Sequence, residues 1–144
     1  MKRHATAIWN GALADGRGTL TTQSGALDNQ GYSFKARFED ESGKSGTNPE
    51  ELLAAAHAGC FAMQLSHFLA ENGTPADELK ARAVVSVEQA DGGFEVRSSR
   101  ITLEARVPGI EAATFQELAD KAKAGCPISK ALGVIEVSLD AKLV

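Results

Sequence analysis

The two cysteines, Cys60 and Cys126, are the residues of this sequence best suited by type to do chemistry. A cysteine inside an apolar helix usually acts as a small core residue. Burial also holds its thiol pKa above the reference value of ~8.5 unless a cation stabilises the thiolate. Cys60 lies in an apolar segment, so its reactivity depends on whether an arginine or lysine reaches it.

Cys126 lies in a different local setting, directly before Pro127. This position predicts the N-cap of a short helical turn, where free backbone N–H groups and the helix dipole lower a thiol pKa. The same residues are compatible with a plain corner between two helices, filled by a small side chain. The two cysteines can also form a disulfide if their Cα atoms come within ~7 Å of each other. Both a reactive and a structural interpretation stay open.

His57 lies one helical turn before Cys60 and has two interpretations, a base or ion-pair partner for the thiol and a hydrogen-bonded core residue. A metal site built from Cys60, Cys126 and His57 lacks a fourth ligand and any familiar ligand spacing, so we do not predict one.

Three charged residues are candidates for activating a thiol. Arg37 falls on the polar face of an expected strand, with an alternation typical of a solvent-facing side chain. Arg17 lies between two glycines and is typical of a turn. Glu50 in the first turn of a helix is explained by the helix dipole alone. Composition and spacing therefore do not by themselves define an active site.

The hydrophobic pattern predicts an α+β fold in a single domain, residues 1–144. Expected strands cover residues 3–9, 19–23, 32–39, 81–89, 94–107 and 134–143. Expected helices cover residues 49–71, 114–125 and 128–132, and a Thr114–Glu117 capping box is expected to start the second. We expect the sheets to be built from antiparallel hairpins.

The first long helix is the unusual element, because residues 52–70 contain no Asp, Glu, Lys or Arg. The segment is mostly alanine, which is too weakly apolar for a bilayer and better suited to a core. A helix of about 22 residues is some 33 Å long, and a chain of this size cannot easily surround it. The sequence therefore suggests a dimer with this helix at its centre.

Composition excludes several other classes. The 144 residues include 15 Lys and Arg against 19 Asp and Glu, a net charge of −4, which argues against a nucleic-acid or anionic-membrane binder. Two cysteines are too few for a disulfide-rich secreted module. No apolar segment follows the basic first residues, so we expect a cytoplasmic protein.

Two strings resemble the cysteine motifs of the OsmC/Ohr family (osmotically inducible protein C and organic hydroperoxide resistance protein). They are TNPEELLAAAHAGCF at residues 47–61 and AKAGCPISK at residues 122–130. Supporting signs are Gly18-Thr19, Ser24-Gly25, Arg37-Phe38-Glu39 and Val107-Pro108-Gly109-Ile110, so the resemblance covers nearly the whole chain. The Arg-Phe-Glu string and His57 are closer to the OsmC branch.

The resemblance implies an intertwined homodimer, with antiparallel sheets around two long central helices and two active sites at the interface. It implies a thiol peroxidase without metal, haem or flavin. The peroxidatic cysteine falls on Cys60 and the resolving cysteine on Cys126, and the activating pair falls on Arg37 and Glu50. Arg17 is the alternative arginine, by comparison with the Ohr branch, and Glu50 could come from either chain.

The function implied is the reduction of organic hydroperoxides, faster than hydrogen peroxide, in defence against oxidative or osmotic stress. Cys60 becomes a sulfenic acid, condenses with Cys126 to a disulfide, and is restored by an external dithiol. This reductant is a lipoyl protein, thioredoxin or a small thiol. The alternatives are a non-catalytic thiol redox sensor or binding protein, and a structural dimer with two inert thiols.

Overall fold

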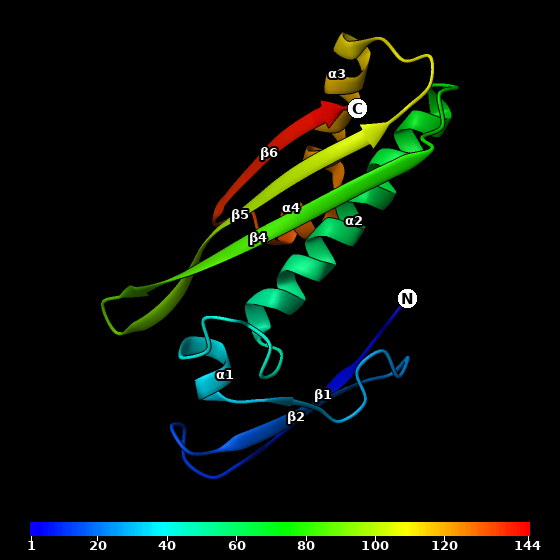
Figure 1. Cartoon of the computed structure of the whole chain (residues 1–144). Coiled ribbons are helices and arrows are strands. Elements are labelled where there is room, and N and C mark those ends of the chain that lie inside the picture. Colours follow the sequence, from blue (N-terminus) through cyan, green and yellow to red (C-terminus); the bar gives the residue numbers. More distant parts are fainter. The chain divides into compact units, whose positions relative to one another are not determined.

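The computed structural model describes all residues, 1–144, and divides them into two compact units, Met1–Pro49 and Glu50–Val144. Each unit is built on its own three-stranded sheet (Figure 1). The first contains β1 (Ala5–Asn10), β2 (Arg17–Thr22), β3 (Gln30–Tyr32) and the short helix α1 (Phe34–Phe38). The second contains α2 (Pro49–Glu71), β4 (Glu78–Ala90), β5 (Gly93–Arg106), α3 (Ala112–Gly125), α4 (Pro127–Ala131) and β6 (Glu136–Leu143). The predicted α+β class is confirmed.

The first sheet is an antiparallel meander in the order β1-β2-β3. Gly18 on β2 faces Trp9 and Tyr32, whose rings are 5.3 Å apart. A Cβ at Gly18 would lie 2.3 Å from the Tyr32 ring, so only glycine allows this close approach.

The strand predicted over residues 32–39 is wrong beyond Tyr32, because the chain turns there into helix α1. Ser33 caps this helix, and its hydroxyl accepts a hydrogen bond from the Ala36 N–H at 3.0 Å. Phe34 and Phe38, which alternation placed on one strand face, instead pack one helical turn apart at 5.0 Å. Aromatic residues spaced i and i+4 satisfy both patterns over so short a segment.

Helix α2 begins at Pro49 and ends at Glu71, as predicted. Gly73 has the left-handed φ of +79° that the Asn72-Gly73 stop signal requires, and the Thr74 N–H closes the end on the Leu69 carbonyl. By length and composition alone α2 is able to cross a membrane. However, Phe61, Leu65 and Leu69 are fully buried, as in the core helix of a globular fold.

The second sheet has the order β4-β5-β6, and α2 and α3 lie on the same face of it (Figure 1). The predicted β4–β5 hairpin is confirmed, with Ala90 paired to Gly93 across a two-residue turn. The β5–β6 pair is parallel, which corrects the expectation of wholly antiparallel sheets. The two strands are parallel because α3 and α4 lie between them in the sequence. These helices return the chain to the end of the sheet where β5 begins, as a parallel crossover requires.

Helix α3 begins at Ala112, two residues before the predicted Thr114. Its N-cap is Glu111, which makes no side-chain cap hydrogen bond, so the predicted Thr114–Glu117 capping box is wrong. The helical hydrogen bonds already start with the Phe115 N–H on the Glu111 carbonyl, 2.9 Å long. Residues 111–113 are exposed, and water can satisfy the free N–H groups of this turn.

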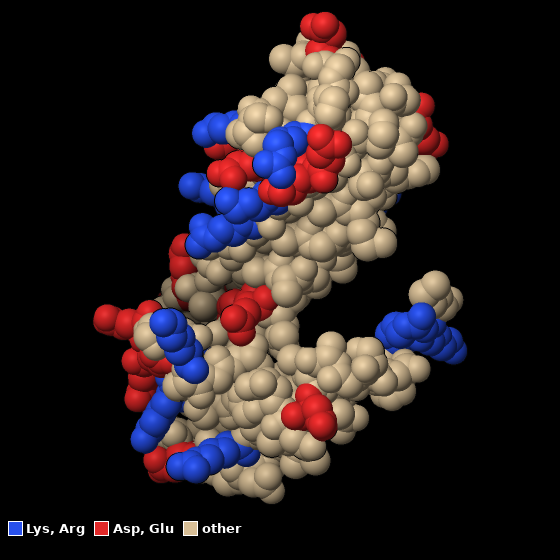
Figure 2. Space-filling model, turned by 45° about the vertical axis from the view of Figure 1, so that its right-hand side comes forward, with Lys and Arg blue, Asp and Glu red and all other residues tan.

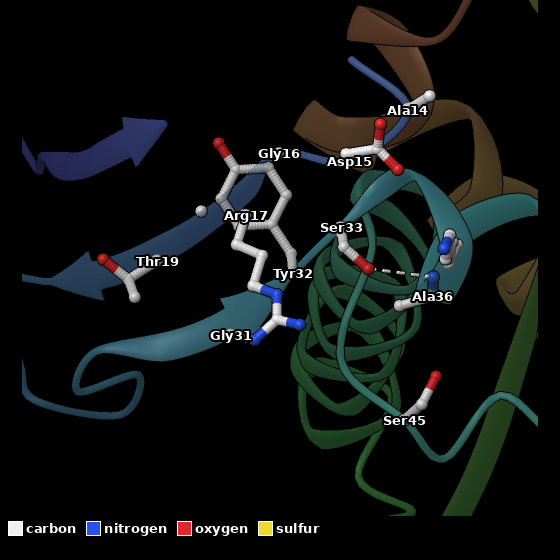
Figure 3. Close-up of a pocket in the computed structure, with 12 residues that line it drawn as sticks. Ala14, Asp15, Gly16, Arg17, Thr19, Gly31, Tyr32, Ser33, Ala36 and Ser45 are labelled. Atoms are coloured by element: carbon white, nitrogen blue, oxygen red, sulfur yellow. Dashed lines mark hydrogen bonds between the residues drawn. The ribbon is translucent and has the colours of Figure 1, made fainter. Parts of the chain in front are cut away.

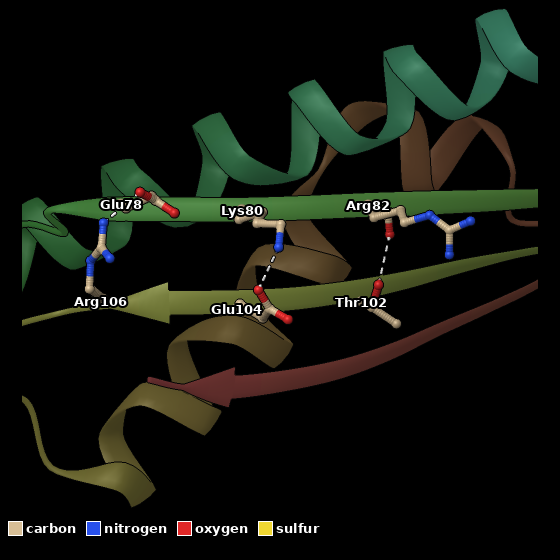
Figure 4. Close-up of polar contacts among 6 residues, drawn as sticks. All are labelled: Glu78, Lys80, Arg82, Thr102, Glu104 and Arg106. Atoms are coloured by element: carbon tan, nitrogen blue, oxygen red, sulfur yellow. Dashed lines mark hydrogen bonds and ion pairs between the residues drawn. The ribbon is translucent and has the colours of Figure 1, made fainter.

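The core of the second unit lies between the helices and the sheet. Its fully or nearly fully buried members are Phe61, Leu65 and Leu69 of α2, Ile101, Leu103 and Ala105 of β5, and Phe115, Ala119 and Ala122 of α3. The opposite face of the sheet carries charged pairs between neighbouring strands, such as Lys80–Glu104 at 2.8 Å (Figure 4). On the face shown in Figure 2, basic and acidic residues are interspersed, without a continuous basic patch.

Candidate active site

The two cysteines lie together in the second unit, with their sulfur atoms 2.8 Å apart. Both thiols are free. A disulfide bond is about 2.05 Å long, so the two sulfur atoms need to move only slightly closer to form one. Cys60 comes from the middle of α2, and Cys126 from the junction of α3 and α4. The fold therefore places side by side two thiols that are 66 residues apart in the sequence.

Cys126 is held by the ends of two helices at once. It is the C-cap of α3, where its N–H donates to the Ala122 carbonyl, and the N-cap of α4, which begins at Pro127. Its sulfur accepts a hydrogen bond from the Ser129 N–H at 3.5 Å. The predicted N-cap position is confirmed.

Access to solvent differs between the two thiols. The Cys126 side chain is completely buried, whereas Cys60 is partly exposed at the edge of the core. The helices approach closely here, because a Cβ on Gly125 would touch Gln64 and Phe68 of α2 at 3.8 Å. Cys60 is therefore the more accessible of the two cysteines in this structure.

The surroundings shift the two thiol pKa values in opposite directions. Burial, together with the hydrogen bond to Cys126, raises the pKa of Cys60. Burial also acts to raise the pKa of Cys126, but hydrogen bonds from Cys60 and from the Ser129 N–H and hydroxyl outweigh it, so this pKa is lowered. Within this unit, Cys126 is the thiol that ionises first.

His57 is completely buried and hydrogen-bonded on both sides of its ring. Its Nδ1 lies 2.7 Å from the Ser99 hydroxyl on β5, and its Nε2 lies 2.8 Å from the Ser129 hydroxyl on α4. The interpretation of His57 as a hydrogen-bonded core residue is therefore confirmed. Sequence reasoning missed both serines, although Ser129 follows Cys126 by the same three residues that separate His57 from Cys60.

We expect His57 to make the protein less stable in acid. Burial lowers the pKa of His57, so below the unfolded value of ~6.5 the unfolded chain binds a proton that the folded chain does not. The free energy of unfolding should then fall as pH decreases from 6.5, by at most about 1.4 kcal/mol per pH unit from this group. Urea unfolding between pH 5 and 7 measures this slope. His57→Gln should have a smaller slope, and an unchanged slope in that variant would contradict the assignment.

Arg37 lies on α1 and not on a strand, which corrects its expected place on a polar strand face. Its side chain is exposed, and its guanidinium carbon lies 4.7 Å from the centre of the Phe38 ring. Glu50 lies in the first turn of α2, as predicted. The two residues belong to different compact units.

Arg17, the alternative arginine, is the first residue of β2 and pairs with Asn10, so the turn predicted for it is wrong. It lines a cavity of about 720 Å³ within the first unit, together with Tyr32 and Ser33 (Figure 3). Because Arg17 places a positive side chain at the wall of this cavity, it is the natural comparison for Arg37.

No group of three or more His, Cys, Asp or Glu side chains is arranged to hold a metal ion. The chemistry that this arrangement supports is that of two neighbouring thiols: oxidation of the accessible one and its condensation with the buried one.

Comparison with known proteins gives consistent matches. A family described as OsmC-like protein matches residues 41–140. The chain is 46% identical over 137 residues to Peroxiredoxin OsmC of Escherichia coli (strain K12), covering 95% of this chain and 93% of that protein. It is 34% identical over 127 residues to the organic hydroperoxide resistance protein OhrB of Bacillus subtilis (strain 168), covering 87% and 89% of the two chains.

Solved structures of related proteins agree with these sequence matches. The crystal structure of Bacillus subtilis OhrB superposes with a TM-score of 0.70 at 31% identity, covering 96% of this chain and 98% of that one. An OsmC like protein from Mycoplasma pneumoniae has a TM-score of 0.76 at 17% identity, covering 100% and 98%, which shows a shared fold.

The fold and these relatives define the class of protein, a cysteine-based peroxidase, as the sequence predicted. The chain belongs to the OsmC-like family and is closer to the OsmC branch than to the Ohr branch.

Proposed function

We propose that this protein reduces organic hydroperoxides to alcohols, using Cys60 as the peroxidatic thiol and Cys126 as the resolving thiol. The observation that carries the proposal is the 2.8 Å distance between the sulfur atoms of two cysteines, one partly exposed and one buried. Relatives named peroxiredoxin and organic hydroperoxide resistance protein support it. The family match spans the boundary between the two units, which supports residues 1–144 acting as one domain.

In the first step the Cys60 thiolate attacks one oxygen of the hydroperoxide. An S–O bond forms, the O–O bond breaks, and the alkoxide leaves with a proton as the alcohol, so that Cys60 becomes a sulfenic acid. Access decides which cysteine attacks, because the more acidic Cys126 is completely buried. A guanidinium at Cys60 would offset the raised pKa of this thiol and stabilise the charge that develops on oxygen.

In the second step Cys126 attacks the sulfur of the sulfenic acid. An S–S bond forms, the S–O bond breaks, and hydroxide leaves with a proton as water. The lowered pKa of Cys126 favours its thiolate, which is the form that attacks. An external dithiol (a lipoyl protein, thioredoxin or a small thiol) then reduces the disulfide. The cycle so written needs no metal, haem or flavin.

We assign Arg37 as the activating arginine and Glu50 as the residue that orients it. A guanidinium can form a forked pair with a carboxylate while its remaining N–H groups face an anion. The resemblance of Arg37-Phe38-Glu39 to the OsmC branch favours Arg37, and Arg17 is the alternative.

Arg37→Lys is expected to lower the second-order rate constant of Cys60 oxidation at least about tenfold, because a lysine keeps the charge but loses the fork. Arg17→Lys is the matched control and should leave the constant within about threefold of wild type. Stopped-flow consumption of one equivalent of cumene hydroperoxide measures both. If Arg17→Lys lowers the rate constant more than Arg37→Lys does, Arg17 is the activating arginine.

Substrate preference should follow the apolar surroundings of Cys60, which lies against the core next to Phe61. We expect cumene hydroperoxide to react about tenfold or more faster than hydrogen peroxide, the discrimination that burial of one apolar group gives. Competition between the two peroxides for the reduced protein measures the ratio. A ratio of one or less would remove the preference for organic substrates.

We also propose that the working form is a homodimer in the cytoplasm, acting in defence against oxidative or osmotic stress. Helix α2 supports the dimer, because small and apolar side chains remain exposed along it: Ala55, Ala56, Gly59, Met63 and Ala70. Met63 alone is 76% exposed, which is unusual for a large apolar residue. A second copy of this helix is the partner that such a surface fits.

A further inference from the structure

Cys126 is enclosed by the helices of the second unit. Its side chain is completely buried, as is Ala122 one turn before it on α3. The junction of α3 and α4 also packs closely on α2, where a Cβ added to Gly125 would lie 3.8 Å from the Phe68 ring. Of the two cysteines, only Cys60 has surface open to solvent.

The environment of Cys126 also favours its release as a thiolate. A thiol that reduces a disulfide attacks one sulfur and expels the other, and the exchange is faster when the attacked sulfur is accessible and the expelled thiol is acidic. The Cys126 sulfur accepts a hydrogen bond from the Ser129 N–H at 3.5 Å, a contact that stabilises negative charge on sulfur. Burial raises the pKa of Cys60, whereas the hydrogen bonds of Cys126 outweigh its burial and lower its pKa. Access and acidity therefore point to the same order of reduction.

We propose that the external dithiol attacks the sulfur of Cys60 and that Cys126 is the thiol expelled. A new S–S bond forms between the reductant and Cys60, the Cys60–Cys126 bond breaks, and Cys126 leaves as a thiolate. The second thiol of the reductant then attacks the first, releases the Cys60 thiolate and closes a disulfide within the reductant. Two electrons pass from the dithiol to the protein. This order rests on the proposed function, in which Cys60 and Cys126 form a disulfide.

Cys60 then reacts with both the peroxide and the reductant, and Cys126 contacts neither. The reverse order, attack on Cys126, needs the junction of α3 and α4 to open, because no surface of Cys126 is exposed. The two orders leave the first adduct on different cysteines, so a chemical map of that adduct separates them.

The test uses wild-type protein oxidised to the disulfide with diamide, so it does not depend on peroxidase activity. Excess 2-mercaptoethanol is added briefly, the exchange is stopped with acid, and free thiols are blocked with N-ethylmaleimide in denaturant. Peptide mass spectrometry then locates both labels in chains that carry one adduct. We expect 2-mercaptoethanol on Cys60 and maleimide on Cys126 at least about ten times more often than the reverse. Equal amounts, or an excess of adduct on Cys126, would overturn the proposal.

The unfolded chain is the matched control. The same oxidised protein is treated in concentrated guanidinium chloride, where both sulfurs are open to solvent. The two adducts should then form in amounts within about threefold of each other. A preference for Cys60 that survives unfolding would mean that neighbouring residues such as Pro127, and not the fold, decide the order, and would overturn the proposal.

A parallel measurement with cumene hydroperoxide separates this inference from the proposed function. Reduced wild-type protein that forms no disulfide with this peroxide would refute the proposed function, while the adduct map of the diamide-oxidised protein still tests the order of attack. Peroxide turnover together with an adduct on Cys126 would leave the peroxidase intact and overturn only the order of reduction.

Discussion

Cys60→Ser is expected to reduce hydroperoxide turnover roughly a thousandfold or more, because a serine hydroxyl at neutral pH is far less nucleophilic than a thiolate and cannot form the sulfenic acid. The change removes one sulfur from the edge of the core and leaves Cys126 in place. The measurement is steady-state consumption of cumene hydroperoxide with excess dihydrolipoamide. Thermal unfolding of the same sample shows whether the variant is folded.

The opposite assignment makes a different prediction for the same variant. If Cys126 were the nucleophile, Cys60→Ser would still consume one equivalent of peroxide, and Cys126→Ser would consume none. That result would reverse the roles, and it would show that a peroxide reaches a sulfur that is completely buried here.

Cys126→Ser is expected to stop the reaction after a single turnover with a dithiol that acts only on disulfides. Cys60 should be oxidised at close to the wild-type rate, because Cys126 does not contact the peroxide. The sulfenic acid then has no neighbouring thiol and should persist long enough to be trapped by dimedone. Intact-mass spectrometry should show one added oxygen or one dimedone adduct per chain.

Two outcomes would contradict this expectation. Undiminished multiple turnover in Cys126→Ser would show that the external thiol resolves the sulfenic acid directly, so the short distance between the two sulfurs would have no part in catalysis. Complete loss of the first turnover would make Cys126, and not Cys60, the peroxidatic residue.

Sequence reasoning was most successful where signals within a few residues decide the structure. The start of α2 at Pro49 and its end before Gly73 are set by local turn chemistry, and so is the N-cap position of Cys126 before Pro127. Each of these depends on free backbone groups or on a φ that one residue type favours, so no tertiary contact is needed to predict it.

The failures occurred where a pattern was short or a partner distant. A helix as short as α1 shows the same spacing of aromatic residues as a strand. The N-cap hydrogen bond of Ser33 is the local signal that favours the helix. The parallel pairing of β5 with β6 depends on the path of the chain through α3 and α4, which strand periodicity does not report. The sequence identified His57 as a candidate but not its hydrogen-bond partners. Ser99 and Ser129 are 42 and 72 residues away in the sequence, so only the tertiary fold brings them to the His57 ring.

The most direct test of the central claim is the number of peroxides that one chain consumes. Reduced protein is mixed with excess cumene hydroperoxide and excess dihydrolipoamide, and peroxide loss is counted per chain. We predict many equivalents, because the 2.8 Å thiol pair can be oxidised, closed as a disulfide and reduced again. Consumption of one equivalent or less would contradict the enzyme and favour a thiol sensor or a structural protein.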